Sequence, residues 1–476
     1  MNQSSRRTKI VATIGPSSRD ERVLRALIEA GVDVVRLNFA HATMDAHMKT
    51  ADLARRLAHD LGKVVGVLVD LPGPKMRTGP IKGEELELEM GQRFVLSGHD
   101  IEGDAERVAT SVEGLSSLVS KGEEIFLADG QIVLLVHSVD GDDVVTEVIR
   151  PGILRSRKGM HVPSAEAHVS AFTAADEVAL RGSLELEADL VGLSFVRDAS
   201  DIQRVRAALP EHGHKPRLVA KIETASAVAN LAEIVPEAEA VMVARGDLGI
   251  QTPLRSVPLV QKEIIKTCNE WGRPVITATQ MLESMTSAPL PTRAEVADVA
   301  NAVLDGTDAL MLSEETAVGA DPVGVLQMMG DVAQSAEAAL AQWPRAVCKD
   351  ARTDAVSWAV SRAAVRAAED LKVAAILCPT RTGSTPRRVA TSRPSMPIVA
   401  LSASLATLGP LGLVWGVVPL HLLETPVAYE QRADVERVTQ AAMRAGLVSP
   451  GELVAVVGGS SGPRAGSTDS VRIVAV

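Results

Sequence analysis

Short apolar runs and amphipathic stretches alternate along the first part of the chain. The apolar runs over 9–15, 32–39 and 64–71 predict buried strands, and the stretches 21–30 and 44–61 between them have the period of amphipathic helices. Strands and helices in this order are typical of parallel βα units.

Between residues 74 and 168 the pattern changes. Apolar and polar residues alternate singly there, and Gly and Asp separate the short runs, as in GEEIFLADGQIVLLV. Alternation with a period of two predicts antiparallel strands with one buried and one solvent-facing side. We therefore predict a small β-barrel domain over 74–168, inserted into the βα series.

The βα series resumes after this insertion. Each of five further apolar runs is followed by a helical stretch, and the runs span 189–195, 217–223, 240–246, 274–280 and 309–313. Three strands before the insertion and five after it make eight. This number predicts an α/β fold, a (β/α)8 TIM barrel built from 1–73 and 169–335.

A second α/β domain is predicted over 345–476, with 343–353 as the connection to the barrel. We expect its elements in six segments: helices at 355–371 and 434–446, and strands at 374–378, 398–401, 453–457 and 470–476.

Net charge, apolar run length and cysteine spacing limit the classes of function and the compartment that we expect. The net charge of −11 opposes binding to nucleic-acid phosphates, although a local cluster of Lys and Arg can still attract an anionic substrate. No apolar run reaches the roughly 18 residues of a membrane span, and no signal-type stretch follows the first residues. The three cysteines are far apart, which indicates a reducing compartment, and we expect a cytoplasmic protein.

Candidate chemistry lies where the barrel strands end, because barrels of this kind carry their active sites there. Taken singly, each charge at such an end is most simply a solvated side chain, and Lys221 with Glu223 is most simply a salt bridge. Their recurrence at one face favours a functional site. The polar side chains at the strand ends are Arg36, Asn38, His41, Asp70, Lys75, Arg77, Lys221, Glu223, Arg245, Asp247, Thr279 and Ser313.

Two of these carboxylates indicate a metal site. Glu223 and Asp247 are 24 residues apart (247 − 223), about one βα unit, so we expect them on neighbouring strands at the same level. Mg²⁺ (or Mn²⁺) suits such a pair, because it takes few protein carboxylates and keeps positions for substrate and water. The neighbouring cations are suited to balance a phosphoryl group during its transfer. No GxxxxGK[ST] or GxGxxG motif is present.

Several segments resemble one enzyme family. KIVATIGPSS, RLNFAHA, LVDLPGPKMRTG, KGMHVPS, VMVARGDLG, VITATQMLESM and PTRAEVADVANAVLDGTDALMLSEETAVG are similar to pyruvate kinase segments, in the same order. The match covers about 9–319, and PTRTGSTPRRVA and GELVAVVGGSSGPRAGSTDSVRI extend it more loosely. The resemblance implies a lid over the nucleotide, a regulatory C-terminal domain and a glycolytic reaction, phosphoenolpyruvate plus ADP giving pyruvate plus ATP.

The resemblance also implies the catalytic roles. Lys221 would stabilise the transferring phosphoryl group, and Glu223 and Asp247 would hold the divalent metal. Thr279 would lie near the face where the enolate is protonated, and Ser313 would order the water that supplies the proton.

Binding roles are implied in the same way. Arg36 and Arg77 would contact phosphates, and Asn38 and His41 would lie on the nucleotide side with Lys158 of the lid. The substrate would be bound by Arg36, Lys221, Ala244, Arg245, Gly246, Asp247 and Thr279.

Some positions depart from the family's pattern. Ala40 stands where Ser is usual, and Ala42 and Glu314 stand where Gly is usual. Many family members hold K⁺ beside the substrate phosphate and carry Glu where this chain has Lys75. We expect the Lys75 ammonium, near Asp70, to replace that ion, so that no K⁺ is required.

Other interpretations stay open at this point. A metal-dependent aldolase or lyase of pyruvate-like acids would share the strand-end carboxylates, but it needs no nucleotide cover. A non-catalytic regulatory homologue is disfavoured by the presence of Lys221, Glu223 and Asp247. The loop 380–388 is either a site for a phosphorylated effector or a solvated basic turn. The family suggests a homotetramer.

Overall fold

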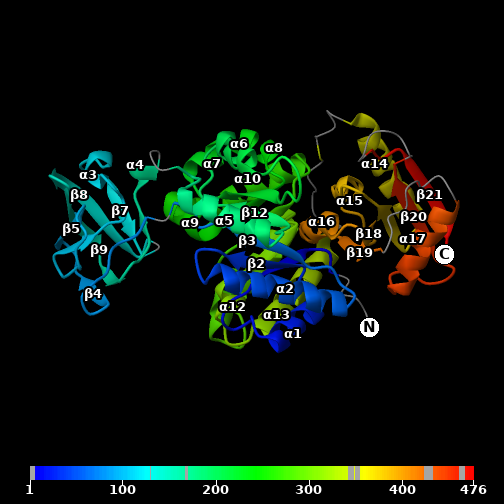
Figure 1. Ribbon diagram of the computed structural model, residues 1–476, viewed down its shortest axis with the longest axis horizontal. Coiled ribbons are helices and arrows are strands. Elements are labelled where there is room, and N and C mark those ends of the chain that lie inside the picture. Colours follow the sequence, from blue (N-terminus) through cyan, green and yellow to red (C-terminus); the bar gives the residue numbers. More distant parts are fainter. Residues whose placement is uncertain are drawn as a thin grey trace.

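The computed structural model describes residues 6–74, 76–128, 130–166, 170–340, 348, 354–422, 432–459 and 467–476. Lys75 and most of the predicted connection 343–353 lie outside these ranges. Three bodies follow one another along the long axis, with the inserted β structure at one end and the C-terminal domain at the other (Figure 1). Within the described ranges, no helix is both long and apolar enough to cross a lipid bilayer.

The central body is a closed barrel of eight parallel strands, which confirms the predicted fold. The strand order around it is β1-β16-β15-β14-β13-β12-β3-β2. The strands are β1 (Lys9–Thr13), β2 (Val34–Asn38), β3 (Gly66–Asp70), β12 (Leu190–Leu193), β13 (Arg217–Ile222), β14 (Ala240–Ala244), β15 (Val275–Ala278) and β16 (Ala309–Leu312).

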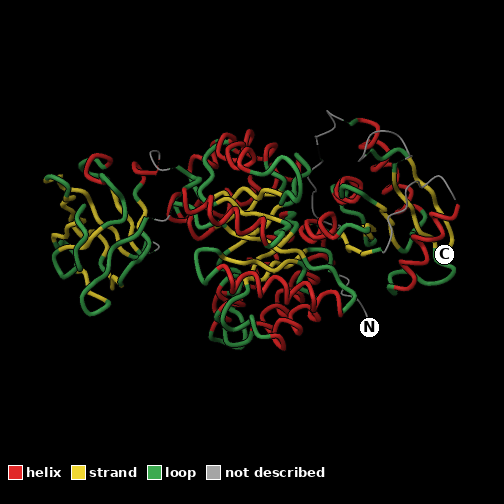
Figure 2. Tube along the Cα trace, in the orientation of Figure 1, coloured by secondary structure: helices red, strands yellow, loops and turns green. Residues whose placement is uncertain are grey.

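Helices surround these strands (Figure 2). Residues at the helix ends cap several of these helices. Thr292 and Glu295 form a capping box at the start of α11, and Gly31 ends α1 in the left-handed conformation. The main barrel helices are α1 (Glu21–Ala30), α2 (Met44–Asp60), α5 (Ala174–Glu185), α6 (Ala199–Ala208), α8 (Leu231–Glu237), α10 (Val257–Glu270), α11 (Arg293–Asp305) and α13 (Pro322–Ala339).

The inserted body consists of short strands, as the alternating pattern predicts. Six of them form one sheet in the order β11-β7-β8-β9-β5-β6, and β10 pairs with β4 as a separate ribbon, so the ladders do not close into a continuous barrel. All pairs are antiparallel except β5 with β6. The strands are β4 (Glu85–Leu88), β5 (Arg93–Ser97), β6 (Arg107–Ala109), β7 (Glu124–Leu127), β8 (Ile132–Asp140), β9 (Asp143–Arg150), β10 (Gly152–Arg155) and β11 (Met160–His161).

The C-terminal domain is a five-stranded sheet in the order β19-β18-β17-β20-β21. Its strands are β17 (Ala375–Pro379), β18 (Ile398–Ser402), β19 (Val417–His421), β20 (Leu453–Gly458) and β21 (Ser470–Ala475). Its helices include α14 (Ala355–Asp370), α15 (Ser384–Ala390) and α17 (Arg432–Arg444). The hydrophobic pattern did not predict β19, which contains Pro419. Proline is tolerated there because β19 is an edge strand.

The barrel interior is an aliphatic core that the C-terminal domain completes. One buried cluster takes residues from all eight strands, Val11, Leu68 and Met242 among them, and Leu413 packs into the same cluster. Leu413 ends the short helix η4 (Gly409–Leu413), which contacts β1, β2 and β3. The C-terminal domain therefore covers the barrel end where the strands begin.

This seam depends on a residue without a side chain. A Cβ at Gly66, the first residue of β3, would lie 2.5 Å from the carbonyl oxygen of Gly409. We expect Gly66→Ala to destabilise the protein by about 1–3 kcal/mol through overpacking and to lower its melting temperature. The control is Gly330→Ala within α13, where a Cβ would meet no atom closer than 3.9 Å. It should raise the melting temperature slightly, because alanine favours the helix. Equal melting temperatures for the two variants would contradict this account of the seam.

Candidate active site

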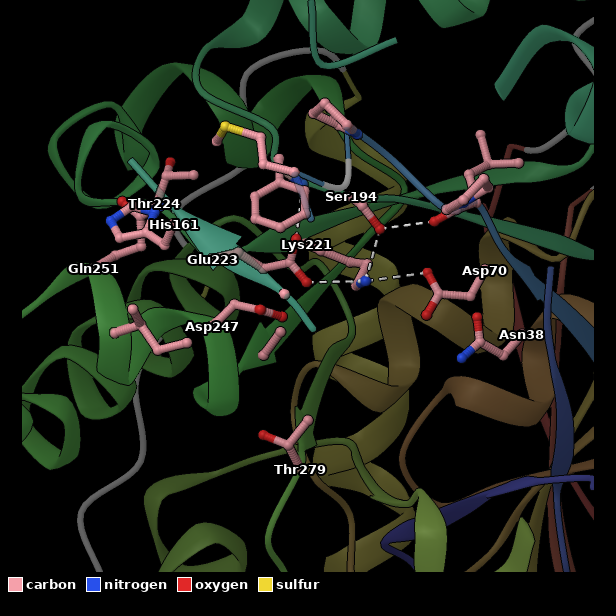
Figure 3. A pocket seen from close by; sticks show the side chains of 18 of the residues that line it. Asn38, Asp70, His161, Ser194, Lys221, Glu223, Thr224, Asp247, Gln251 and Thr279 are labelled. Atoms are coloured by element: carbon pink, nitrogen blue, oxygen red, sulfur yellow. Dashed lines mark hydrogen bonds and ion pairs between the residues drawn. The ribbon is translucent and has the colours of Figure 1, made fainter. Parts of the chain in front are cut away.

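A cavity of about 430 Å³ opens at the barrel end where the strands finish, between the barrel and the inserted β body. Figure 3 shows side chains from several strand ends converging on it. Most of the residues predicted for the site line this cavity: Arg36, Asn38, His41, Asp70, Arg77, Lys158, Lys221, Glu223, Ala244, Asp247, Thr279 and Ser313.

Lys221, on β13, is the central cation. Its ammonium nitrogen lies 2.9 Å from Glu223 Oε1 and 3.3 Å from Asp70 Oδ1, and it donates to Ser194 Oγ at 2.8 Å. Burial by itself would lower the pKa of Lys221, but the charges of Asp70 and Glu223 outweigh it and raise that pKa above its ordinary value. The side chain therefore remains positively charged at any physiological pH.

Asp70, on β3, contacts two cations, Arg36 on the neighbouring strand β2 and Lys221 on β13. Arg36 donates to Asp70 Oδ2 through Nε at 3.0 Å and through a second guanidinium nitrogen, and its remaining nitrogen donates to Thr13 Oγ1 at 3.0 Å. Burial would raise the pKa of Asp70, but Lys221 and Arg36 together hold it below its ordinary value. Asp70 therefore stays ionised and fixes both cations at the cavity wall.

Glu223, which directly follows β13, is a buried carboxylate with a raised pKa. Burial and then the charge of Asp247 raise its pKa to about 7, although Lys221 acts in the opposite direction and the backbone N–H of Phe195 donates to Oε2 at 2.7 Å. Glu223 is only 1% exposed. An additional positive charge at this position would favour the ionised form.

A divalent cation fits this arrangement. Glu223 and Asp247 point into the same part of the cavity (Figure 3). Asp70 Oδ1 and Glu223 Oε1 are buried and accept no well-aligned hydrogen bond within the part of the chain that the structure describes, although each lies beside Lys221. The carboxylates of Glu223 and Asp247 would supply two hard oxygen donors. Mg²⁺ takes such a ligand set when substrate and water supply the remaining ligands.

Asp247 sits on a different element from the one predicted. The sixth barrel strand was expected to run over 240–246, but β14 ends at Ala244 and the short helix α9 (Arg245–Gln251) begins at the next residue. Asp247 is thus in the first turn of α9. The first turn of α9, in addition to the pairing of β14 with β13, brings Asp247 beside Glu223.

Arg245 and Gly246, predicted to bind substrate, are not among the residues that line the cavity. The Arg245 guanidinium points to the backbone, where it donates to the carbonyl oxygens of Thr279 at 2.6 Å and of Gln280 at 3.1 Å, and it pairs with Asp298. The N–H of Gly246 donates to Thr279 Oγ1 at 2.8 Å. These contacts act on the cavity through Thr279.

The Thr279 segment needs such support. Thr279 and Gln280 have φ angles of +66° and +52°, so two consecutive non-glycine residues adopt the left-handed conformation. This conformation costs of order 1–3 kcal/mol for each residue and persists only where neighbouring groups enforce it. We infer that Arg245 positions Thr279.

Ser313 has an unused hydroxyl group at the cavity wall. Its backbone N–H donates to Glu315 Oε2 at 2.6 Å, whereas Oγ is buried and has no hydrogen-bond partner in the described ranges. A buried polar atom of this kind is suited to bind a water molecule.

Arg77 and Lys158 approach the cavity from the inserted body. Arg77 and Gly159, the residue after Lys158, form an isolated antiparallel β-bridge between the two segments that join the barrel to the inserted body. The Arg77 side chain donates to the carbonyl oxygen of Arg157 at 3.0 Å. The segments that join the barrel to the inserted body therefore carry two of the predicted phosphate-binding cations.

Ser194 was not among the residues predicted for the site. This residue follows β12, accepts the hydrogen bond from Lys221, and donates to the carbonyl oxygen of Leu71 at 2.8 Å. Its place at the end of a barrel strand was the available signal. A serine there is too common to have been selected without its partner.

The fold and the cavity define a barrel enzyme that gathers buried cations and carboxylates to act on an anionic substrate. A family model described as pyruvate kinase, barrel domain, matches residues 5–326, and one described as pyruvate kinase, alpha/beta domain, matches residues 358–474.

Curated relatives agree with these family models. The chain is 41% identical over 432 residues to a pyruvate kinase of Thermococcus litoralis, covering 89% of this chain and 90% of the relative. It is 40% identical over 475 residues to the enzyme of Geobacillus stearothermophilus, covering 98% and 80%, and to pyruvate kinase 2 of Synechocystis sp., covering 99% and 79%. The chain belongs to the pyruvate kinase family and is a phosphotransferase.

The support that Arg245 gives to Thr279 can be tested through stability. Arg245→Gln removes charged hydrogen bonds to backbone carbonyl oxygens, and we expect it to cost about 2–4 kcal/mol and to lower the melting temperature. Arg255→Gln, at an exposed position on η1 (Leu254–Ser256), is the matched control and should leave the melting temperature unchanged. An unchanged melting temperature in Arg245→Gln would show that the Thr279 segment holds its conformation without this side chain.

Proposed function

We propose that the protein is a pyruvate kinase that transfers the phosphoryl group of phosphoenolpyruvate to ADP. The observation that carries this proposal is the permanently charged Lys221, held between Asp70 and Glu223 at the wall of a cavity that Arg36, Arg77 and Lys158 also line. Such a group of fixed cations is suited to a transferring phosphoryl group, because that group carries its charge on exposed oxygens.

The chain's own residues divide the work of this reaction. Lys221 and Arg36 face the phosphoryl group of phosphoenolpyruvate and stabilise its charge as it leaves the enol oxygen. Arg77 and Lys158, with Asn38 and His41, hold ADP so that a β-phosphate oxygen is in line for attack. A divalent metal held by Glu223 and Asp247, which we take to be Mg²⁺ or Mn²⁺, supplies further positive charge beside the substrate carboxylate and phosphate.

The second half of the reaction adds a proton to the enolate carbon. Thr279 lines the cavity opposite Lys221 in the close view of the site (Figure 3). The Ser313 hydroxyl, which has no hydrogen-bond partner in the described ranges, is suited to bind a water molecule in the same cavity. We propose that this water donates the proton and that Thr279 positions the pyruvate portion to receive it.

The aldolase or lyase alternative accounts for fewer of these residues. It explains the two carboxylates but not Arg77 and Lys158, which come from the inserted body. We propose that residues 74–168 close over the nucleotide as a lid and exclude water, with the barrel at 1–73 and 169–335 and the regulatory domain at 345–476.

Further properties follow from the same assignment. We propose a cytoplasmic homotetramer that acts in glycolysis, with a phosphorylated effector bound at the loop 380–388. Allosteric control of this kind would reach the barrel through the seam formed by η4.

The proposed role of Lys221 is tested with a coupled assay of pyruvate formation. The unmodified enzyme should form pyruvate only when ADP and a divalent metal are present. Lys221→Ala should lower kcat by about 10³-fold or more, while the KM for phosphoenolpyruvate changes far less, because one preorganised charge is lost from the transition state.

Two controls accompany this variant. Lys82→Ala removes an exposed lysine of the inserted body and should leave kcat unchanged. Because Lys221→Ala leaves buried carboxylates with less compensation, its folded fraction is measured by circular dichroism before activities are compared. A folded Lys221→Ala enzyme with a tenth of the original kcat would contradict the assignment.

Independence from K⁺ is the second test. Position 40 carries a methyl group in place of a hydroxyl ligand, and Asp70 already contacts two cationic side chains. We expect full activity in sodium or tetraalkylammonium buffer with Mg²⁺ alone. Lys75→Glu should lower the rate, and K⁺ should restore part of it. Strong activation of the unmodified enzyme by K⁺, beyond that of a sodium salt at matched ionic strength, would overturn this expectation.

A further inference from the structure

A second cavity lies at the opposite end of the barrel from the active site, where the strands begin. It measures about 60 Å³ and is lined by residues of both the barrel and the C-terminal domain. Arg273 and Pro274 precede β15, Asp308 precedes β16, and Arg387 belongs to α15 of the C-terminal domain. The cavity therefore spans the seam between the two domains.

The carboxylates in its wall are already engaged. Asp308 pairs with Arg393 at 3.1 Å and accepts the N–H of Val275 at 3.0 Å. Asp305 pairs with Lys262 and accepts from Gln261. Neither carboxylate is left to compensate a further cation.

Two arginines of the wall lack such compensation. Arg273 donates to the carbonyl oxygen of Pro236 at 2.6 Å, but its Nε is buried without a hydrogen-bond partner in the described ranges. Over the same ranges, the Arg387 guanidinium forms no hydrogen bond and no ion pair. Burial, and then the positive charges of Arg217 and Arg273, lower the pKa of Arg387 to about 10.

The carboxylate whose charge acts to raise the pKa of Arg387 is also engaged. Glu239 pairs with Arg206 at 2.9 Å and accepts the N–H of Leu218 at 2.9 Å. Arg273 and Arg387 thus line the cavity without a carboxylate left to compensate them, and the positive charge of Arg217 also acts on Arg387. Partly buried like charges of this kind repel each other unless an anion lies between them.

We propose that this cavity binds a tetrahedral oxyanion of the size of phosphate. The volume of about 60 Å³ exceeds the roughly 10–15 Å³ that a single water molecule needs and suits one small oxyanion. Arginine is the side chain best matched to such a ligand, because its planar guanidinium donates two parallel hydrogen bonds. The bound oxyanion would tie α15 to the barrel.

This site is separate from the outward face of the loop 380–388. Arg381 of that loop is exposed, and Arg388 pairs with Asp354 at 3.1 Å, whereas Arg387 lines the cavity against the barrel. Arg362→Gln, at an exposed position on α14 outside this loop, serves as the control for Arg387→Gln, since both remove one guanidinium group from the C-terminal domain.

The test measures binding of inorganic phosphate to the full chain by titration calorimetry and by thermal unfolding in chloride buffer, without substrates or metal. The unmodified protein and Arg362→Gln should bind phosphate with similar affinity and gain thermal stability from it. Arg387→Gln should bind at least about tenfold more weakly, because charged hydrogen bonds to the oxyanion are lost. Glycerol phosphate is titrated in parallel. Competition by it assigns the site to a phosphate group carried by a larger molecule, and its failure assigns the site to the free anion.

Stability without phosphate gives an independent readout. Arg387→Gln should not lower the melting temperature in chloride buffer, because it relieves repulsion. A marked loss of stability would instead mean that Arg387 has a counter-charge within the protein, and this would overturn the proposal. Equal phosphate binding by all three proteins would overturn it as well, since phosphate would then be bound at the active site or elsewhere.

Discussion

A single buried ammonium group, that of Lys221, sets the constraint on which the site depends. A charge removed from water needs opposite charge at contact distance, and Asp70 and Glu223 provide it at 3.3 and 2.9 Å. Those two carboxylates come from different strands of the barrel, β3 and the end of β13. The closed barrel brings these strand ends together at one face, and so the fold positions the charge network.

The charges of this network are not all compensated within the protein. Asp70 contacts both Lys221 and Arg36, while the raised pKa of Glu223 shows a carboxylate that burial and Asp247 push toward its neutral form. Replacing buried ion pairs by apolar side chains often increases stability, so such a network contributes little to folding. It is suited instead to bind ligands that bring their own charges, a metal at Glu223 and Asp247 and a phosphoryl group at Lys221 and Arg36.

The two ends of the barrel are built differently. At the active-site end, charged side chains surround an open cavity that the inserted body faces. At the other end, Leu413 of η4 fills the barrel interior, and Arg393 packs on Trp415 with its guanidinium carbon 5.0 Å from the ring centroid while pairing with Asp308. The cavity lined by Arg273 and Arg387 lies at this closed end. An anion there would act on the contact between the domains and not on the chemistry.

The sequence alone determined the eight barrel strands, the inserted β body and the carboxylates and cations at the strand ends, because hydrophobic periodicity is local and barrel active sites lie at strand ends. The family resemblance added roles that spacing could not supply. Only the tertiary structure decided that Arg245 turns away from the cavity to hold Thr279, that Ser194 accepts from Lys221, and that Asp247 lies on a helix. Each of these depends on side chains from different strands or on where a strand ends, and neither the direction of a side chain nor its distant partner is encoded in a local pattern.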